Sequence, residues 1–401
     1  MRILCLYLHY HSPDCPSSAR AYSLLRRLGR DHEVTLLTGS SWRSQRVTHQ
    51  FDWTPPGVSL HQLHVPYANE MGIFRRLLAY AGFPLWALIR GLRLPPPDLI
   101  YGISTPLSTG WAAASLARFY RVPWIFEVRD LWPDFPIQMG AISNPVLVRA
   151  LHALERWLYR SAAHVITVSP DMEAHVRQAA PAATTSTVEY GTEFDLVDAI
   201  TSEQVCALRN QYDLPASGVV LYAGTFGRAN AIPTLIRAAR RLQHRSDVCF
   251  VFAGQGYHAS TIREAADALP NVRLVPPQPR LRSLALFRLA DVSITSFVDR
   301  PVLGTNSPSK LYDSLAVGTP VIVTNPGWMQ RLVQAHGCGW YVPPEQPETL
   351  AQKVAALFDR PAAIDAAGIR AAAIARDRFD RAQHMDRIAE LVDAVGRSSR
   401  P

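Results

Sequence analysis

Short apolar runs alternate with amphipathic stretches along most of the chain. Residues 2–8 form the first apolar run, a polar loop follows, residues 20–31 carry leucines on one helical face, and residues 33–39 form the next run. Apolar runs of this length, bounded by turns, predict strands that are buried on both faces of a parallel sheet. Strand, loop, helix and strand make up the unit from which such sheets are built.

The same alternation continues through both halves of the chain. In the first half we expect further strands at 58–65, 98–104, 122–128 and 164–169, with helices at 110–120 and 145–161. In the second half we expect strands at 219–224, 248–254, 272–277, 292–297 and 320–325, with helices at 233–243, 260–269, 280–289 and 308–317. The pattern predicts an α/β protein with two Rossmann-like, doubly wound domains that face a cleft, where the loops after the strands bind ligands.

Domain boundaries follow from the two series. We expect an N-terminal, acceptor-side domain over residues 1–195 and a donor domain over residues 196–380. Residues 347–397 are helical and Ala-rich, and the final segment, residues 381–401, has no strand of its own to cover, so it should pack back toward the N-terminal domain. The length of 401 residues and the hydrophobic content of 48% suit two domains, each with its own core.

Membrane spans and redox chemistry are constrained by composition. No run approaches the roughly 20 uncharged apolar residues of a membrane span, and Met1 leads directly into a strand, so we expect it to be the uncleaved start. The five cysteines show no metal-ligand spacing, which favours a reduced, cytoplasmic compartment and no metal site.

The chain carries a formal charge of +8 and has a pI near 9.4. This balance suits an anionic partner, such as sugar phosphates or acidic lipid. Nucleic acid is disfavoured because the basic residues are scattered among acidic ones, without a basic stripe interleaved with aromatics. Of the 41 basic residues only Lys310 and Lys353 are lysines, so each needs a local explanation.

A glycine-containing loop follows the first strand of the second half. Its glycines permit a tight turn, and the free N–H groups of the helix that follows, together with an arginine, favour a phosphate. An ordinary strand-to-helix turn with a solvated arginine is an equal alternative. The candidate donor-binding residues here are Gly224, Thr225, Gly227, Arg228 and Asn230, with Gly254 at the end of the next strand as a weaker candidate.

Residues 303–320 contain the most informative polar cluster. We expect Pro308 in the first turn of a helix, Ser307 at its N-cap, and Lys310 and Asp313 on one side of it. A cation in a first helical turn opposes the helix dipole unless an anion is bound there. The candidates for donor binding are Thr305, Asn306, Ser307, Ser309, Lys310 and Asp313; a surface Lys310 paired with Asp313 is the alternative.

Four charges and a tryptophan follow a buried strand of the first half. Glu127, Arg129 and Asp130 are candidate catalytic residues, and Trp132 lies beside them as a candidate acceptor residue. Charged groups at the end of a strand should line the cleft, although Arg129 could instead belong to an internal network with Glu127 or Asp130. Arg20 either reaches a diphosphate from the opposite side or caps its own helix.

Residues 73–93 combine aromatic and aliphatic residues with arginines near both ends. A stretch that is too short to span and is flanked by cations predicts a segment at an anionic membrane surface. A pair of core helices is equally compatible with the pattern.

The blocks EVRDLWPD, LYAGTFGRAN and NSPSKLYDSLAVGTPVIV, in this order, resemble the GT-B glycosyltransferases of family 4. The resemblance is greatest to the bacterial subgroup of O-antigen, capsule and exopolysaccharide assembly. In that family two Glu residues, seven positions apart, bind the donor sugar and the ribose. Asp313 matches the second and Thr305 stands at the first, so only ribose binding carries over. Where the family often has His–Asp, this chain has Arg129–Asp130, and the glycine pair of the N-terminal loop is missing from residues 11–19.

The resemblance implies sugar transfer with retention and without a metal or other cofactor. Arg228 and Lys310 would hold the diphosphate of the nucleotide-sugar donor, and the leaving phosphate, Glu127 or Asp130 would be the base. It also implies a polyprenyl-diphosphate-linked glycan acceptor and a cytoplasmic enzyme peripheral to the inner membrane face. A non-hydrolysing nucleotide-sugar epimerase and a catalytically inactive sugar-nucleotide-binding module remain alternatives.

Overall fold

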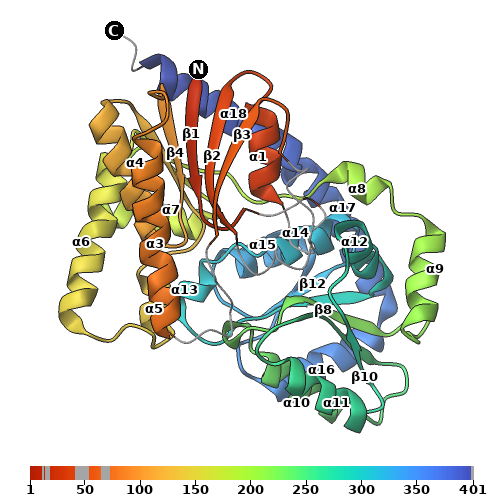
Figure 1. Cartoon of the computed structure of the whole chain (residues 1–401). Coiled ribbons are helices and arrows are strands. Elements are labelled where there is room, and N and C mark those ends of the chain that lie inside the picture. The colour runs from red at the N-terminus through yellow and green to blue at the C-terminus, as the bar shows by residue number, and fades with distance from the viewer. Residues whose placement is uncertain (11–12, 14–18, 41–53, 65–72, 399–401) are drawn as a thin grey trace.

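The computed structural model describes residues 1–398 except 11–12, 14–18, 41–53 and 65–72, and it leaves out the side chains of 40, 64 and 73–81. Most of the loop between residues 12 and 20 and the first half of the segment 73–93 therefore lie outside the described side chains. Figure 1 shows two α/β bodies, one containing the N-terminus and the other built from the second half of the chain.

The N-terminal body is built on a seven-stranded parallel sheet in the order β3-β2-β1-β4-β5-β6-β7. Its strands are β1 (Arg2–Tyr7), β2 (Glu33–Ser40), β3 (Val58–His64), β4 (Leu99–Ile103), β5 (Trp124–Val128), β6 (His164–Thr167) and β7 (Thr185–Thr187). Its helices are α1 (Arg20–Leu28), α3 (Ile73–Gly91), α4 (Leu107–Tyr120), α5 (Asp134–Gln138), α6 (Pro145–Ser161) and α7 (Pro170–Ala179).

The second body is built on a six-stranded parallel sheet in the order β10-β9-β8-β11-β12-β13. Its strands are β8 (Val219–Thr225), β9 (Cys249–Gln255), β10 (Val272–Val275), β11 (Val292–Thr295), β12 (Val321–Val323) and β13 (Gly339–Tyr341). Its helices are α8 (Phe194–Asp198), α9 (Ser202–Gln211), the 3₁₀ turn η1 (Arg228–Asn230), α10 (Ile232–Arg241), α11 (Ala259–Ala268), α12 (Arg280–Leu289), α13 (Pro301–Gly304), α14 (Ser309–Ala316), α15 (Trp328–His336), α16 (Pro347–Phe358) and α17 (Pro361–Arg378).

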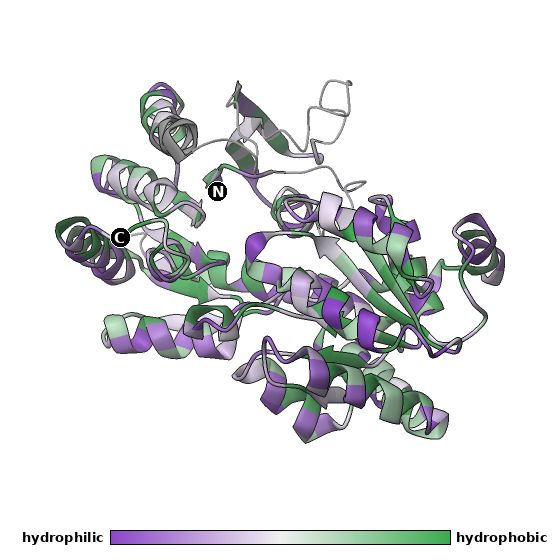
Figure 2. Ribbon diagram, turned by 90° about the horizontal axis from the view of Figure 1, so that it is seen from below, coloured by the Kyte–Doolittle hydropathy of each residue, from purple (hydrophilic) through white to green (hydrophobic). Residues whose placement is uncertain are grey.

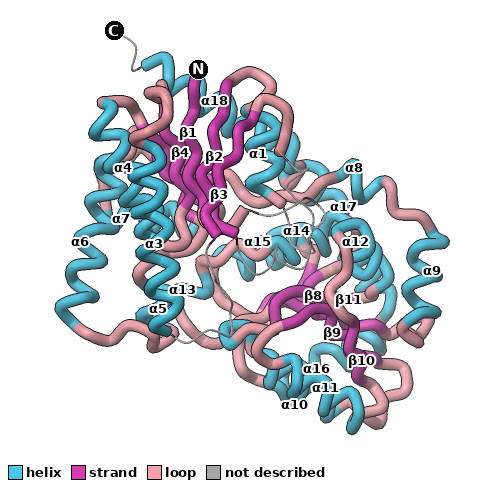
Figure 3. The backbone as a smooth tube through the Cα atoms, in the orientation of Figure 1, coloured by secondary structure: helices cyan, strands magenta, loops and turns pink. Residues whose placement is uncertain are grey.

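The last helix, α18 (Arg381–Ser398), packs on α1 of the N-terminal body. Met385, Ile388 and Val392 join the buried cluster that covers one face of the first sheet, while α3 and α4 cover the other face (Figure 3). Figure 2 shows hydrophobic residues concentrated in the strands of both sheets. The predicted α/β architecture of two doubly wound parallel sheets is confirmed.

The sequence pattern does not predict two of the strands, β7 and β13. β7 consists of Thr-Ser-Thr, whose side chains are half-buried, and β13 has three residues, so neither shows an apolar run. Residues 73–91 form one helix, α3, rather than a pair. No described helix of this chain has both the length and the apolar character that a bilayer crossing demands.

The two bodies touch through the segments that follow their strands. The Ser169 hydroxyl at the start of α7 donates to the carbonyl of Thr305 at 2.6 Å, and the Trp328 N–H donates to the Asp171 carboxylate at 2.8 Å. In addition, the N–H of Val302 in α13 donates to the Gln138 side chain at the end of α5 at 3.0 Å. The carboxyl edges of the two sheets, where ligands of open α/β sheets bind, therefore face each other.

Candidate donor and acceptor sites

The loop after β8 is held by its own side chains. The carbonyl oxygen of Thr225 accepts from the Tyr222 hydroxyl at 2.8 Å and from the Asn230 amide at 2.9 Å. The Ser296 hydroxyl at the end of β11 fixes the carbonyl of Asn230 at 2.8 Å. Asn230 therefore shapes the loop, and its amide is not free to bind a ligand.

Close backbone approach explains the glycines of this region. Gly224 and Gly254 have φ values of +136° and +148°, and a Cβ on Gly254 would lie 1.9 Å from the carbonyl oxygen of Gly224. Any side chain at Gly254 would push the ends of β8 and β9 apart. Gly254 is thus required by packing between two strands, while Gly224 is exposed and free to approach a ligand. A Cβ added at Gly227 would lie 3.0 Å from the side-chain amide nitrogen of Asn230, so a side chain there would disturb the turn.

Lys310 extends from the first turn of α14 toward the end of β8. Its Cε and Nζ lie 3.2 Å from where a Cβ on Gly224 would stand, and Nζ lies 3.8 Å from the centre of the Tyr222 ring. Within the described part of the chain, no carboxylate comes within 4.0 Å of this ammonium group. Burial lowers the pKa of Lys310 to about 7. The predicted alternative of a Lys310–Asp313 surface pair is therefore wrong, because Asp313 pairs elsewhere.

Arg228 stands in η1 at the far end of the same loop. Its guanidinium is exposed and lies 4.1 Å from the centre of the Tyr257 ring, a residue of the loop after β9. The stacking holds the side chain near the loop without using its N–H groups. Arg228 and Lys310 therefore both lie beside the loop after β8, which contains Gly224 and Gly227.

The residues before α14 differ in part from the sequence prediction. The helix begins at Ser309 with Pro308 as its N-cap, and the Ser307 hydroxyl shares a hydrogen bond of 2.6 Å with the Tyr312 hydroxyl. Ser307 is therefore not the N-cap. No side chain caps α14, which leaves the first N–H groups of the helix available to an anion.

Thr305 contacts the N-terminal body, whereas Asn306 is bonded within the second body. The Thr305 hydroxyl donates to the Val302 carbonyl at 2.7 Å, and its own carbonyl is the acceptor of Ser169. The Asn306 carbonyl accepts the Trp328 indole N–H at 2.9 Å. Of this predicted set, Ser309 and Lys310 lie at the open N-terminus of α14.

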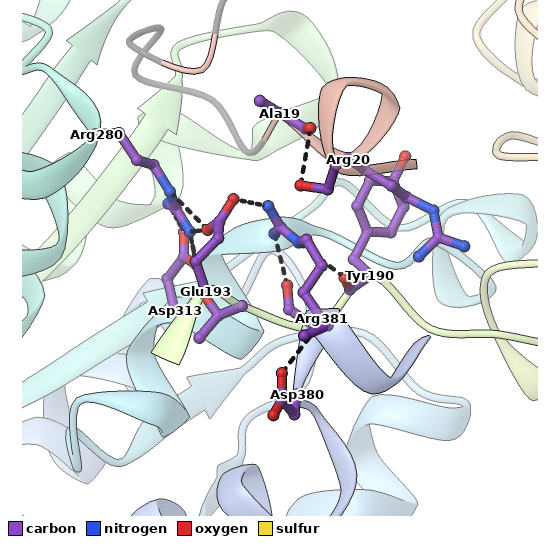
Figure 4. Close-up of polar contacts among 12 residues, drawn as sticks. Ala19, Arg20, Tyr190, Glu193, Arg280, Asp313, Asp380 and Arg381 are labelled. Carbon is purple, nitrogen blue, oxygen red and sulfur yellow. Dashed lines mark hydrogen bonds and ion pairs between the residues drawn. The ribbon is translucent and has the colours of Figure 1, made fainter. Parts of the chain in front are cut away.

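Asp313 belongs to a buried ionic network rather than to an open pocket. Its two carboxylate oxygens accept from Arg280 at 2.6 and 2.7 Å, and the Thr192 hydroxyl donates to it as well. Arg280 also pairs with Glu193 at 2.7 Å, and Glu193 pairs with Arg381 (Figure 4). Asp313 is 3% exposed. The predicted ribose contact is therefore not what its geometry shows, because Arg280 occupies the carboxylate.

This network joins three distant segments of the chain. Thr192 and Glu193 follow the N-terminal body, Arg280 begins α12, and Arg381 begins α18. Nearby carboxylates keep these buried guanidiniums paired, and burial lowers the pKa of Arg381 to about 10. The crossover from one body to the other is thus fixed by charge pairs in which both arginines and Asp313 are buried and Glu193 is partly exposed.

Glu127 is the centre of a second buried network. It is fully buried and accepts from Arg20 at 2.9 Å, from the Tyr101 hydroxyl at 2.8 Å and from Arg129 at 3.0 Å. Burial would raise its pKa, but Arg129 and Arg20 hold that pKa at about 2. A carboxylate so firmly ionised and so fully bonded is a poor base, so the internal network describes Glu127 better than a catalytic role does.

Arg20 neither reaches a diphosphate nor caps its helix. It is 1% exposed, and its remaining N–H groups donate to the carbonyls of Val188 at 2.9 Å and Glu189 at 2.5 Å. All three sides of this guanidinium are occupied by protein, so Arg20 is a structural residue that ties α1 to the crossover.

Asp130 retains the features of a reacting group. It follows β5, is half-buried, and accepts from the Thr105 hydroxyl at 2.8 Å. Burial raises the pKa of Asp130 to about 6, against the opposing effects of Thr105 and Arg129. Thr105 has a φ of 82°, which is unusual for a residue with a β-branched side chain and is typical of functional sites. The Trp132 N–H donates to the Asp130 carbonyl at 3.0 Å, and the Trp132 ring packs against the main core.

Several residues of these sites could not be selected from the sequence. Arg280 and Arg381 are two arginines among many, and Tyr222, Tyr257 and Thr105 sit in ordinary strand and loop contexts. Their roles depend on contacts across more than 20 residues, such as Lys310 with Tyr222 and Thr105 with Asp130. Only the scarcity of lysine gave a local signal.

Comparison with known proteins agrees with this arrangement. The chain matches the model of the glycosyl transferase 4-like domain over residues 17–191 and that of the glycosyl transferases group 1 over residues 217–360. It is 21% identical to the candidate glycosyltransferase WbjE of Pseudomonas aeruginosa over 58% of this chain, and it spans 58% of that relative's length. It is 25% identical to WcaI of Escherichia coli K12, named as a candidate colanic acid biosynthesis glycosyl transferase, over 73% of this chain and 75% of WcaI.

A solved structure shares the fold over nearly the full length. HepE of Anabaena, in complex with UDP-glucose, superposes with a TM-score of 0.72 at 17% identity, covering 98% of this chain and all of HepE. The two family models together span most of the chain, in the order of its two sheets. The chain belongs to the GT-B glycosyltransferases of family 4.

Proposed function

We propose that this protein is a retaining glycosyltransferase that moves a hexose or N-acetylhexosamine from a nucleotide diphosphate donor to a polyprenyl-diphosphate-linked glycan in surface polysaccharide biosynthesis. The observation that carries the proposal is Lys310. Its ammonium group is desolvated and meets no carboxylate in the described structure, and it stands at an uncapped helix N-terminus beside a glycine of positive φ. An unpaired cation in that position is stabilised by a bound phosphate.

The donor diphosphate would lie between Lys310 and Arg228, over Gly224. The N–H groups of Ser309 and Lys310 at the start of α14 add the positive end of the helix dipole. These fixed groups would stabilise the charge that develops on the leaving diphosphate, without a metal ion. The uncapped helix and the free ammonium support this assignment.

In the transfer step, the acceptor hydroxyl oxygen forms a bond to the anomeric carbon while the bond from that carbon to the phosphate oxygen breaks. The bonding electron pair goes to the diphosphate, and the hydroxyl proton goes to the leaving phosphate oxygen. Asp130, with a pKa raised by burial to about 6, would orient a sugar or acceptor hydroxyl by hydrogen bonding. Thr105 fixes the carboxylate for that role.

The names of similar proteins support the substrate classes. HepE was solved with UDP-glucose, which supports a nucleotide-sugar donor, and the printed name of WcaI supports a place in exopolysaccharide assembly. A polyprenyl-linked acceptor would keep the enzyme at the cytoplasmic face of the inner membrane.

The exposed face of α3 supports contact with a membrane surface. Leu85, Ile89 and Leu92 are 52%, 51% and 42% exposed and recur at helical spacing, so they form one apolar stripe. Arg93 lies exposed at the end of this stripe. Apolar side chains with cations beside them suit the interface of an anionic bilayer.

A thermal-shift panel of UDP-, GDP- and dTDP-sugars, followed by transfer assays with the sugar nucleotide that binds, tests the proposal. A donor should raise the melting temperature of the wild type. Lys310→Ala should remove that shift and most of the transfer, whereas Lys353→Ala, the other lysine of the chain, should change neither. A wild type that binds no sugar nucleotide, or Lys310→Ala with normal turnover, would refute it.

A further inference from the structure

Arg129 has one side-chain nitrogen, Nη2, that donates to no residue in the described part of the chain. The side chain is only 7% exposed, its Nε donates to Glu127 at 3.0 Å, and its backbone N–H donates to the Ser104 hydroxyl at 2.8 Å. The Nη2 atom is buried and has no hydrogen-bond partner among the described residues. Burying a charged donor without an acceptor costs free energy, so an acceptor such as a bound ligand is expected at this position.

The surroundings hold this guanidinium in place without satisfying it. Its central carbon lies 4.7 Å from the centre of the Tyr7 ring and 5.9 Å from that of the Tyr190 ring. The rings stabilise the guanidinium through its face, and the Tyr7 side chain also hydrogen-bonds to it. The orientation of Arg129 is therefore fixed while Nη2 stays available.

Arg20 offers an internal comparison, because it contacts the same carboxylate. Arg20 donates to Glu127 and to two backbone carbonyls, so its N–H groups are used by the fold. Arg129 and Arg20 share the single carboxylate of Glu127, and Asp130 forms no ion pair with Arg129 within 4.0 Å in the described structure. The two guanidiniums therefore share one ion-pair partner, and Asp130 attracts Arg129 only from a longer distance.

The Arg129 guanidinium lies at the carboxyl edge of the N-terminal sheet, toward α14 of the second body. Tyr190, over which Arg129 lies, hydrogen-bonds through its backbone to the Tyr312 hydroxyl, and Tyr312 in turn bonds Ser307 just before α14 at 2.6 Å. One ring therefore separates Arg129 from the segment that leads into the N-terminus of α14.

We propose that Nη2 of Arg129 binds a diphosphate oxygen of a bound substrate, so that the N-terminal body supplies a binding cation opposite Lys310. The inference rests on the proposed function. The diphosphate could be that of the sugar nucleotide or that of the lipid-linked acceptor, since both present the same oxygens to Nη2. Bound there, the oxyanion gives Nη2 of Arg129 a charged hydrogen-bond acceptor.

Titration calorimetry with three probes separates the sources: UDP-glucose for the donor, farnesyl diphosphate for the acceptor, and inorganic pyrophosphate for the shared group. Arg129→Gln keeps a donor for Glu127 but removes the charge, and it should weaken at least one probe about tenfold or more. Loss confined to UDP-glucose and pyrophosphate assigns the donor, and loss confined to farnesyl diphosphate and pyrophosphate assigns the acceptor. Arg20→Gln is the matched control and should leave the affinities of folded protein unchanged.

Arg129→Lys provides a second variant, because it keeps the charge that Glu127 needs for folding but cannot serve Glu127 and a ligand together. It should weaken the same probe by about threefold or more. Wild-type affinity of both Arg129 variants for all three probes, or equal losses in Arg20→Gln, would overturn the inference. Loss of nucleotide-sugar binding in Lys310→Ala alongside normal Arg129 variants would leave the proposed function standing while this inference fails.

Discussion

The lowered pKa of Lys310 makes donor binding dependent on pH. Burial lowers this pKa to about 7 in the ligand-free protein, whereas an unburied lysine has the ordinary value of 10.5. A bound diphosphate favours the charged ammonium and raises the pKa again. The free site therefore loses its proton as pH rises above about 7, and binding must return it. Affinity should fall as pH rises through this window.

The magnitude follows from the two pKa values. If the bound state regains the full ordinary pKa of 10.5, the affinity falls by at most roughly fifteenfold between pH 7 and pH 8.5, or about 1.6 kcal/mol. Over this range the phosphates of a sugar nucleotide are diesters that do not titrate, so the change reports the protein. In the ligand-free fold the charged form of Lys310 is disfavoured, so the free energy of unfolding without ligand should rise as the pH increases from 7 to 8.5.

Titration calorimetry of UDP-glucose in two buffers of different ionisation enthalpy measures both affinity and proton uptake. We expect nearly one proton to be taken up per bound donor at pH 8 by the wild type. Lys310→Arg keeps its charge throughout and should bind with little pH dependence. Lys353→Arg is the control and should behave as the wild type. Affinity that is flat from pH 7 to 8.5 with no proton uptake would refute the reasoning.

Three further predictions concern the networks and surfaces of the fold. Asp313→Asn should lower the free energy of unfolding by about 3 kcal/mol, measured by urea denaturation, because it breaks a buried pair with Arg280; unchanged stability with weakened donor binding would instead favour ribose contact. Gly254→Ala should abolish folding, measured by circular dichroism, or donor binding, measured by thermal shift, because its Cβ would lie 1.9 Å from a carbonyl oxygen; a well-folded, active variant would contradict the packing described. Ile89→Glu should reduce sedimentation with vesicles containing anionic lipid, while Ile369→Glu, at a residue 73% exposed on α17, should not; equal sedimentation of both variants would exclude the α3 surface.

Most of the fold follows from the hydrophobic pattern. The central strands β1, β4 and β8 contain apolar runs of four or more residues, and α6 and α12 have the predicted bounds, Pro145–Ser161 and Arg280–Leu289. The edge strands β7 and β13 could not be predicted because three residues with half-buried side chains carry no periodic signal.

The site is less predictable than the fold, for a physical reason. Sequence spacing placed Lys310 and Asp313 on one side of a helix, but it could not show that Arg280, 33 residues away, would occupy the carboxylate. Likewise Glu127, Arg129 and Asp130 are neighbours in sequence, yet Arg129 and Arg20 hold the pKa of the buried Glu127 at about 2, whereas burial raises the pKa of Asp130 to about 6. Environment decides these roles, and it is set by residues far along the chain.

The central claim is that Lys310 and the open start of α14 hold the diphosphate of the donor. A crystal structure of the protein with UDP-glucose, or with whichever sugar nucleotide gives the largest thermal shift, tests it most directly. We expect Nζ of Lys310 within about 3 Å of a diphosphate oxygen and the N–H groups of Ser309 or Lys310 turned to the same group. A nucleotide bound elsewhere, with Nζ still against the Tyr222 ring, would contradict the claim.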